Sequence, residues 1–145
     1  MILKDSIEIK TTSEKVFEWL THFPENYTEW HPDHVTCHYV TGGSMEEGSV
    51  LYCEEYIHGD LHSMKFRLTR IEPTRIDYDI LFPMSIICPK GSFIVGLKGD
   101  YCIFTATLSF RLDTLLSVLF KKRVESLRTH MKEEGENLKR LLESK

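Results

Sequence analysis

Three separate places in the sequence each carry a pair of side chains whose types suit metal binding. The pairs are His31 with His34, Glu55 with His62, and His130 with Glu134. Imidazole nitrogens and carboxylate oxygens are the usual ligands of catalytic zinc, and they also bind iron and manganese. A fold that brings these pairs together would build a metal centre, with zinc as the expected ion and iron or manganese as alternatives.

The pair Glu55 and His62 lies in a segment with the pattern of a β-hairpin. Residues Val50 to Ile71 form two alternating runs on either side of Gly59-Asp60, which favours a two-residue turn. With that turn, Glu55 faces Met64 and lies diagonally across from His62, and all three side chains share the apolar face. A carboxylate on a core face is costly unless a partner neutralises it. We therefore predict that Glu55 is a site residue.

The pair His130 and Glu134 lies in a long C-terminal helix predicted from Leu115 to Leu142. An apolar stripe runs along this helix with spacings of three and four, and Glu134 fills its one gap, so its carboxylate is predicted to face the sheet. His130 is four residues earlier and shares that side. The alternative is that both residues form a partly exposed pair at the edge of the stripe. The stripe consists of Leu116, Phe120, Val124, Leu127, Met131, Leu138 and Leu141.

Other interpretations of these histidines remain open at this stage. His31 and His34 have an HxxH spacing, which is a weak signal outside a helical HExxH motif. His34 could bind the metal or hydrogen-bond a substrate. Glu55 and a protonated His62 could also form a buried ion pair without metal, or an acid–base couple with perturbed pKa values.

The strands and helices that must position these residues follow a simple order along the chain. A strand at Leu3 to Lys10 is followed by two short helices, then by six strands joined largely by hairpins, then by the long helix. The second helix runs from Pro24 to Trp30, and the next strand begins at His34. Antiparallel strands in this order are expected to form a curved sheet of about seven strands wrapped on the C-terminal helix, an α+β fold. The whole chain, 1–145, is predicted to be a single domain.

The length, composition and net charge of the chain exclude some classes of function. The chain has 145 residues, 41% of them hydrophobic, and a net charge of -4, which favours a globular domain and argues against a nucleic-acid surface. Its one tight basic run, Lys121 to Arg123, is interpreted as a solvated turn of helix. The sequence lacks a run of about eighteen apolar residues and a signal peptide, so we expect no membrane partner and a cytoplasmic location. Four isolated cysteines are expected to be reduced. The pattern carries no signal for oligomeric state.

The order of elements resembles the helix-grip superfamily, which is also called START-like, Bet v 1-like, SRPBCC or polyketide cyclase/dehydrase. The segment EKVFEWL in the first helix and the long last helix carry this likeness over nearly the whole chain. The resemblance implies a deep apolar cavity between sheet and helix, and a START-like domain.

Three segments are similar to a narrower branch, the diacetylphloroglucinol/phloretin hydrolases: HFPENYTEWHPDH, EEYIHGDLH and HMKEEGENLK. That resemblance implies a zinc held by histidine and glutamate, which assists cleavage of a carbon–carbon bond next to a ketone. By position it implies the metal ligands His31, Glu55 and Glu134, with His62 as the fourth.

The sequence therefore suggests two functions of different classes. The first is a metal-dependent hydrolase of a small, aromatic ketone, in which His34 and His130 transfer protons and Tyr27 and Tyr78 hydrogen-bond phenolic groups. The second is a non-catalytic binding protein or carrier for a small apolar molecule. In both, Met64 and Phe66 are expected to line the substrate cavity.

Overall fold

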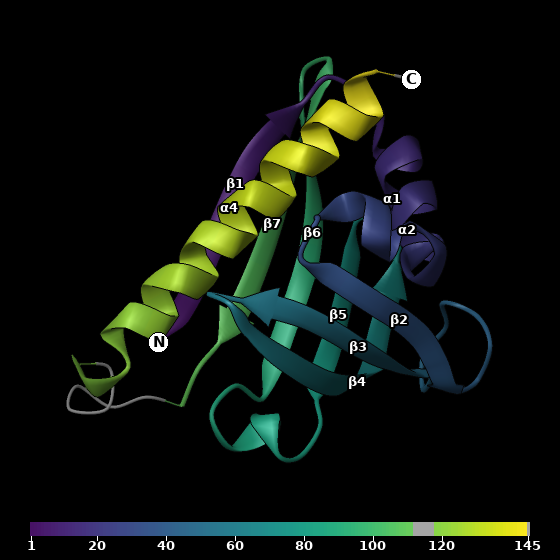
Figure 1. The fold of residues 1–145 in the computed structure, drawn as a ribbon. Coiled ribbons are helices and arrows are strands. Elements are labelled where there is room, and N and C mark those ends of the chain that lie inside the picture. Colours follow the sequence, from purple (N-terminus) through teal and green to yellow (C-terminus); the bar gives the residue numbers. More distant parts are fainter. Residues whose placement is uncertain (112–117, 145) are drawn as a thin grey trace.

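The computed structural model describes residues 1–111 and 118–144 of the chain. Within them, seven antiparallel strands form one sheet in the order β1-β7-β6-β5-β4-β3-β2 (Figure 1). This confirms the predicted α+β helix-grip architecture. The strands are β1 Ile2–Ile9, β2 His34–Thr41, β3 Val50–Ile57, β4 Asp60–Glu72, β5 Arg75–Ile80, β6 Lys90–Lys98 and β7 Tyr101–Ser109.

The helices also follow the predicted order. Helices α1 (Ser13–Thr21) and α2 (Phe23–Trp30) connect β1 to β2, and a short helix η1 (Met84–Ile86) lies in the loop between β5 and β6. Helix α4 (Lys121–Glu143) crosses the sheet diagonally over β1 and β7 (Figure 1). The predicted start of this helix at Leu115, and Leu116 of its stripe, lie outside the described residues.

Helix α2 carries the aromatic residues that anchor the site to the core. Its Phe23, Tyr27 and Trp30 are buried, and the Trp30 ring lies edge-on to Trp19 of α1 with centroids 5.2 Å apart. The helix ends where His31 adopts an extended backbone (φ -151°, ψ 138°), and β2 begins three residues later at His34. The end of α2 and the start of β2 are therefore held against the packed core.

The β3–β4 hairpin differs from prediction by one residue at its turn. His58 (φ 53°) and Gly59 (φ 83°) are both left-handed, so they are the two central residues of the turn, in place of Gly59 and Asp60. As a result Glu55 lies directly opposite His62, not diagonally across from it. The side-chain faces are unchanged, because moving the turn by one residue shifts both strands by one.

Helix α4 presents its apolar stripe to the sheet as predicted. Val124, Met131 and Leu138 are buried. Gly135 allows a close approach to β1, because a Cβ there would lie 3.1 Å from the Asp5 carboxylate. The side chain of Glu134 is only 17% exposed, so it fills the gap in the stripe from the inner side.

The four cysteines are free thiols in the structure. Cys37 on β2 and Cys53 on β3 are direct cross-strand partners, with their sulfur atoms 3.0 Å apart. None of the helices in the described ranges combines the length and the apolar composition needed to cross a membrane.

Candidate functional site

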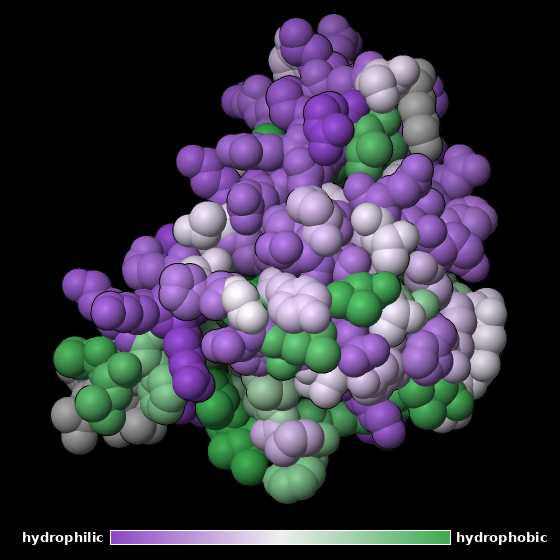
Figure 2. All heavy atoms as spheres, viewed as in Figure 1, coloured by the Kyte–Doolittle hydropathy of each residue, from purple (hydrophilic) through white to green (hydrophobic). Residues whose placement is uncertain are grey.

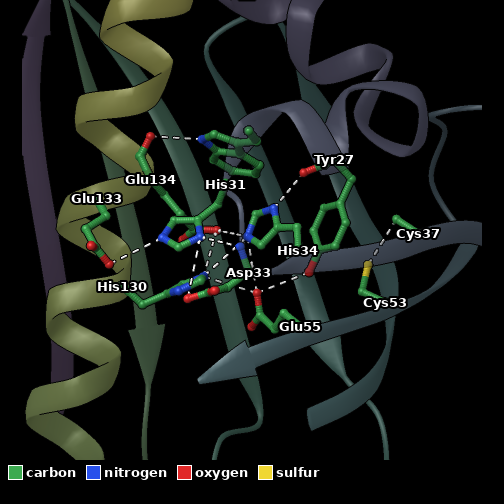
Figure 3. Close-up of polar contacts among 11 residues, drawn as sticks. Tyr27, His31, Asp33, His34, Cys37, Cys53, Glu55, His130, Glu133 and Glu134 are labelled. Atoms are coloured by element: carbon green, nitrogen blue, oxygen red, sulfur yellow. Dashed lines mark hydrogen bonds and ion pairs between the residues drawn. The ribbon is translucent and has the colours of Figure 1, made fainter. Parts of the chain in front are cut away.

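Four side chains from three elements converge at one point between the sheet and α4 (Figure 3). His34 begins β2, Glu55 lies opposite it on β3, and His130 and Glu134 come from successive turns of α4. One ligand atom from each lies within 4.8 Å of all the others. His34, Glu55 and His130 are buried, and the Glu134 side chain is 17% exposed, so of the pair considered as partly exposed only Glu134 reaches solvent.

The imidazole nitrogens and carboxylate oxygens of these four side chains lie close to one another. His34 Nε2 lies 2.8 Å from Glu134 Oε2 and 3.3 Å from Glu55 Oε2. His130 Nε2 lies 3.2 Å from Glu55 Oε2 and 3.5 Å from Glu134 Oε2. The two imidazole nitrogens are 3.3 Å apart. For comparison, neighbouring ligand atoms around a tetrahedral zinc are separated by about 3.4 Å.

Two residues of α2, Tyr27 and Trp30, make hydrogen bonds to residues of the cluster. The backbone carbonyl of Tyr27 accepts a hydrogen bond from His34 Nδ1 at 2.7 Å, and the Tyr27 hydroxyl donates to Glu55 Oε2 at 3.1 Å. Trp30 Nε1 donates to the backbone carbonyl of Glu134 at 2.9 Å. When His34 is neutral, the proton on Nδ1 leaves the lone pair on Nε2 directed at the cluster, as in many metal-binding histidines.

Burial and neighbouring charges shift the pKa values of the cluster residues in opposite directions. Burial lowers the pKa of both imidazoles, but hydrogen bonds and charges from Glu134 and Glu55 outweigh it. The pKa of His34 is raised to about 9 and that of His130 to about 10. Burial likewise raises the carboxyl pKa values, yet the bonds to His130 and His34 leave the pKa of Glu55 and of Glu134 lowered. Without metal, two imidazolium ions and two carboxylates therefore neutralise one another at pH 7.

This balance predicts a pH dependence of stability for the metal-free protein. The folded-state pKa values of His34 and His130 lie above their ordinary 6.5. The stability they contribute is therefore complete below about pH 6.5, and it is lost as the pH rises through 9 to 10. Thermal melts in chelator should show a falling melting temperature over this range, and the fall should shrink in the variant His130→Leu. An unchanged fall in that variant would contradict this assignment.

His31 lies beside the cluster but both of its nitrogens are already used. Its Nδ1 accepts a hydrogen bond from the backbone N–H of Asp33 at 2.9 Å, and its Nε2 lies 3.3 Å from the Glu133 carboxylate. Its ring packs on His130 with centroids 4.3 Å apart. His31, Asp33 and His130 form a second group of convergent ligand atoms, but Asp33 is exposed. The geometry therefore favours His31 as a residue that positions His130.

His62, the other predicted ligand, lies outside the four-residue cluster. It is partly buried on β4, where it lines the cavity opposite Glu55. Among the described residues, the ion pairs of Glu55 are formed with His34 and His130, and the predicted Glu55–His62 pair is not one of them. His34 and His130, predicted to transfer protons, lie within the four-residue cluster.

An apolar cavity of about 320 Å³ extends from the cluster to the surface. Glu55, His130 and Glu134 contribute to its wall, as do the predicted substrate-binding residues Tyr27 and Tyr78. The hydroxyl of Tyr27 donates a hydrogen bond to Glu55, so its proton is directed at the cluster. The wall is otherwise mainly aromatic and aliphatic; it includes Phe23, Trp30, Met64, Phe66, Ile80, Met84, Phe93, Leu108, Phe110, Phe120, Leu127 and Met131.

Comparison with known proteins agrees with this architecture. The family model described as "Polyketide cyclase / dehydrase and lipid transport" matches residues 2–143. No curated protein matches the chain in sequence. Among solved structures, TTHA0849 from Thermus thermophilus is 12% identical over 97% of this chain and 95% of its own, with a TM-score of 0.76.

Two further structures with this fold have names that state a function or a ligand. The di-domain ARO/CYC BexL from the BE-7585A biosynthetic pathway is 14% identical, with a TM-score of 0.75; the match covers 100% of this chain and 50% of BexL. Norcoclaurine synthase from Thalictrum flavum, in complex with dopamine and hydroxybenzaldehyde, is 10% identical with a TM-score of 0.74, over 97% of this chain and 85% of its own. At these identities the likeness is one of fold.

Proposed function

The chain belongs to the polyketide cyclase/dehydrase and lipid transport family, and from this premise we propose that it is a metal-dependent hydrolase of a small, aromatic ketone. The observation that carries the proposal is the convergence of His34, Glu55, His130 and Glu134, the last three of which line an apolar cavity. Two imidazoles and two carboxylates are a donor set that suits zinc, with iron or manganese as alternatives.

The residues present fit such an ion on three counts. Five of the six distances among the donor atoms are 2.8 to 3.5 Å, and the Nδ1 of His34 is hydrogen-bonded to a carbonyl, which orients Nε2. The two carboxylates compensate the charge of a divalent cation in a buried setting. A divalent ion held there would supply Lewis-acid polarisation of a carbonyl oxygen and a more acidic water.

The proposed reaction consumes one water for each carbon–carbon bond broken. Water adds to the carbonyl carbon, the bond from that carbon to the aromatic ring breaks, and the ring carbon takes a proton, so the products are a carboxylic acid and the deacylated ring. His62 is the partly buried imidazole of the cavity wall outside the cluster, and we assign proton transfer to it. The aromatic wall around Phe66 and Phe93 would hold the ring of the substrate.

The activity is tested with acylated phenols of the phloroglucinol type. Metal-free protein should be inactive, and added zinc, iron or manganese should give release of a carboxylic acid, followed by NMR. The variant His62→Gln should lose about 100-fold or more in kcat while it binds metal normally. Metal-loaded protein that binds such ketones without turning them over would contradict the hydrolase.

A second function, a non-catalytic carrier of a small apolar molecule, is favoured by one separate observation. The cavity and its apolar wall are complete without any contribution from a metal. Native mass spectrometry of freshly purified protein separates the two proposals, since a carrier should retain an apolar ligand whether or not the cluster is loaded.

The hydrogen bond from Tyr27 to Glu55 can be tested by a single substitution. Tyr27→Phe removes the hydroxyl that donates to Glu55 but keeps the backbone carbonyl that holds His34. Loss of such an outer hydrogen bond should weaken metal binding by about 10- to 100-fold, as measured by competition with a chromophoric chelator. Tyr52→Phe, on the outer face of β3, is the matched control and should bind metal like the wild type. Equal affinity in Tyr27→Phe would show that this bond does not support the site.

A further inference from the structure

Large apolar side chains are exposed at one end of the molecule, and they come from three separate segments. Phe82 and Ile86 project from the loop between β5 and β6, and they are 77% and 62% exposed. Val118 and Leu119 lie just before α4 and are 67% and 70% exposed, while Leu61 at the β3–β4 turn is half exposed. Figure 2 shows hydrophobic atoms gathered at the lower left and along the bottom of the molecule, where the α4 start and this loop lie in Figure 1.

This apolar rim surrounds the mouth of the cavity. The cavity wall near the surface is formed by neighbours of the same exposed residues: Asp60 at the hairpin turn, Met84 and Ile87 in the loop, and Phe120 and Arg123 at the start of α4. A molecule that leaves the cavity therefore passes between apolar side chains that face solvent. Exposed apolar groups gathered in this way usually mark an interaction surface.

The charge beside the rim is positive although the chain as a whole is negative. Lys121, Lys122 and Arg123 begin one residue after the exposed Val118 and Leu119. All three are exposed, although the chain has a net charge of -4. Arg111 adds a further exposed cation, and its backbone N–H bonds to Ile87 of the loop. Two carboxylates also lie here: Asp60 lines the cavity, and Glu125 in the first turns of α4 lies 3.8 Å from Arg128.

We propose that this end of the molecule docks on an anionic lipid bilayer. Apolar side chains next to a basic cluster are the combination that binds such a surface, because the former enter the interface and the latter attract anionic headgroups. A second copy of the chain fits less well, since a symmetric contact would bring the two basic clusters together. The expectation of no membrane partner rests on the lack of a spanning segment, and peripheral contact needs none.

Vesicle flotation tests the proposal directly. The wild type should float with vesicles of phosphatidylcholine and phosphatidylglycerol, and only weakly with phosphatidylcholine alone, and its binding should fall as salt is raised. Phe82→Glu and Leu119→Glu should each reduce the bound fraction by about tenfold, and Lys122→Glu should reduce it on anionic vesicles only.

The matched control variants introduce a glutamate at exposed positions away from the apolar rim. Leu97→Glu changes a side chain that is 73% exposed at the far end of β6, and Lys15→Glu changes an exposed lysine of α1. Both should float like the wild type, and circular dichroism should show every variant folded. The proposal is overturned if the wild type does not bind vesicles, or if the controls lose binding equally. Concentration-dependent dimerisation that Leu119→Glu removes, without vesicle binding, would instead assign the rim to a second copy.

Discussion

Replacement of Glu55 by glutamine should abolish metal binding while the fold survives. The side chain keeps its size, but the buried cluster loses one of its two carboxylates, and a neutral amide is a far weaker ligand for a divalent cation. Glu55 Oε2 lies within 3.3 Å of both imidazole nitrogens of the cluster, so the substitution removes a donor that contacts both histidines. We expect the affinity for zinc to fall by at least about 1000-fold, which exceeds the effect of losing an outer hydrogen bond.

Glu54→Gln is the matched control for this experiment. Glu54 is the preceding residue of the same strand and faces the opposite side of the sheet, where its cross-strand partner is Ser63. Elemental analysis of dialysed protein should give about one equivalent of metal in the wild type and in Glu54→Gln, and close to none in Glu55→Gln. Retention of a full equivalent by Glu55→Gln would rule out the proposed ligand set.

The second large effect concerns the stability of the chelated protein. His130→Leu removes one buried imidazolium and leaves two buried carboxylates with a single cation, His34. An uncompensated buried charge of this kind costs about 3 to 5 kcal/mol of unfolding free energy. Urea denaturation in chelator should show this loss, whereas His38→Leu, which changes an exposed histidine of β2, should change the stability little.

A double variant separates charge imbalance from loss of packing. His130→Leu combined with Glu134→Leu leaves Glu55 and His34 as a balanced pair, 3.3 Å apart. The double variant should therefore recover most of the stability that the single variant loses. If the two substitutions instead destabilise additively, the cluster is not held together by the mutual neutralisation described here.

Much of the fold could be predicted because its strands alternate. The period of two assigns each residue of the β3–β4 hairpin to a face, and this assignment holds for either choice of turn. The cross-strand partner of each residue does depend on the choice of turn. Both His58-Gly59 and Gly59-Asp60 could occupy the two central turn positions. Only the structure shows that His58 is left-handed, which places Glu55 opposite His62.

The candidate site was partly predictable for the same reason. Glu55 and Glu134 are acidic residues at positions that the pattern reserves for apolar ones, so their inward direction follows from the sequence. The choice among the histidines does not follow, because His31 and His34 are three residues apart across the end of a helix. What separates them is the bond from the Asp33 N–H to His31 Nδ1, which is a property of the turn and not of the residue types.

The central claim is that His34, Glu55, His130 and Glu134 hold one divalent metal ion. The most direct measurement is anomalous diffraction at the zinc absorption edge from crystals grown with stoichiometric zinc. We predict a single strong peak among His34 Nε2, His130 Nε2 and one oxygen of each carboxylate, at about 2.0 to 2.2 Å from each. No peak there, or a peak between His31 and Asp33 with the four-residue cluster still closed by its own hydrogen bonds, would contradict the claim.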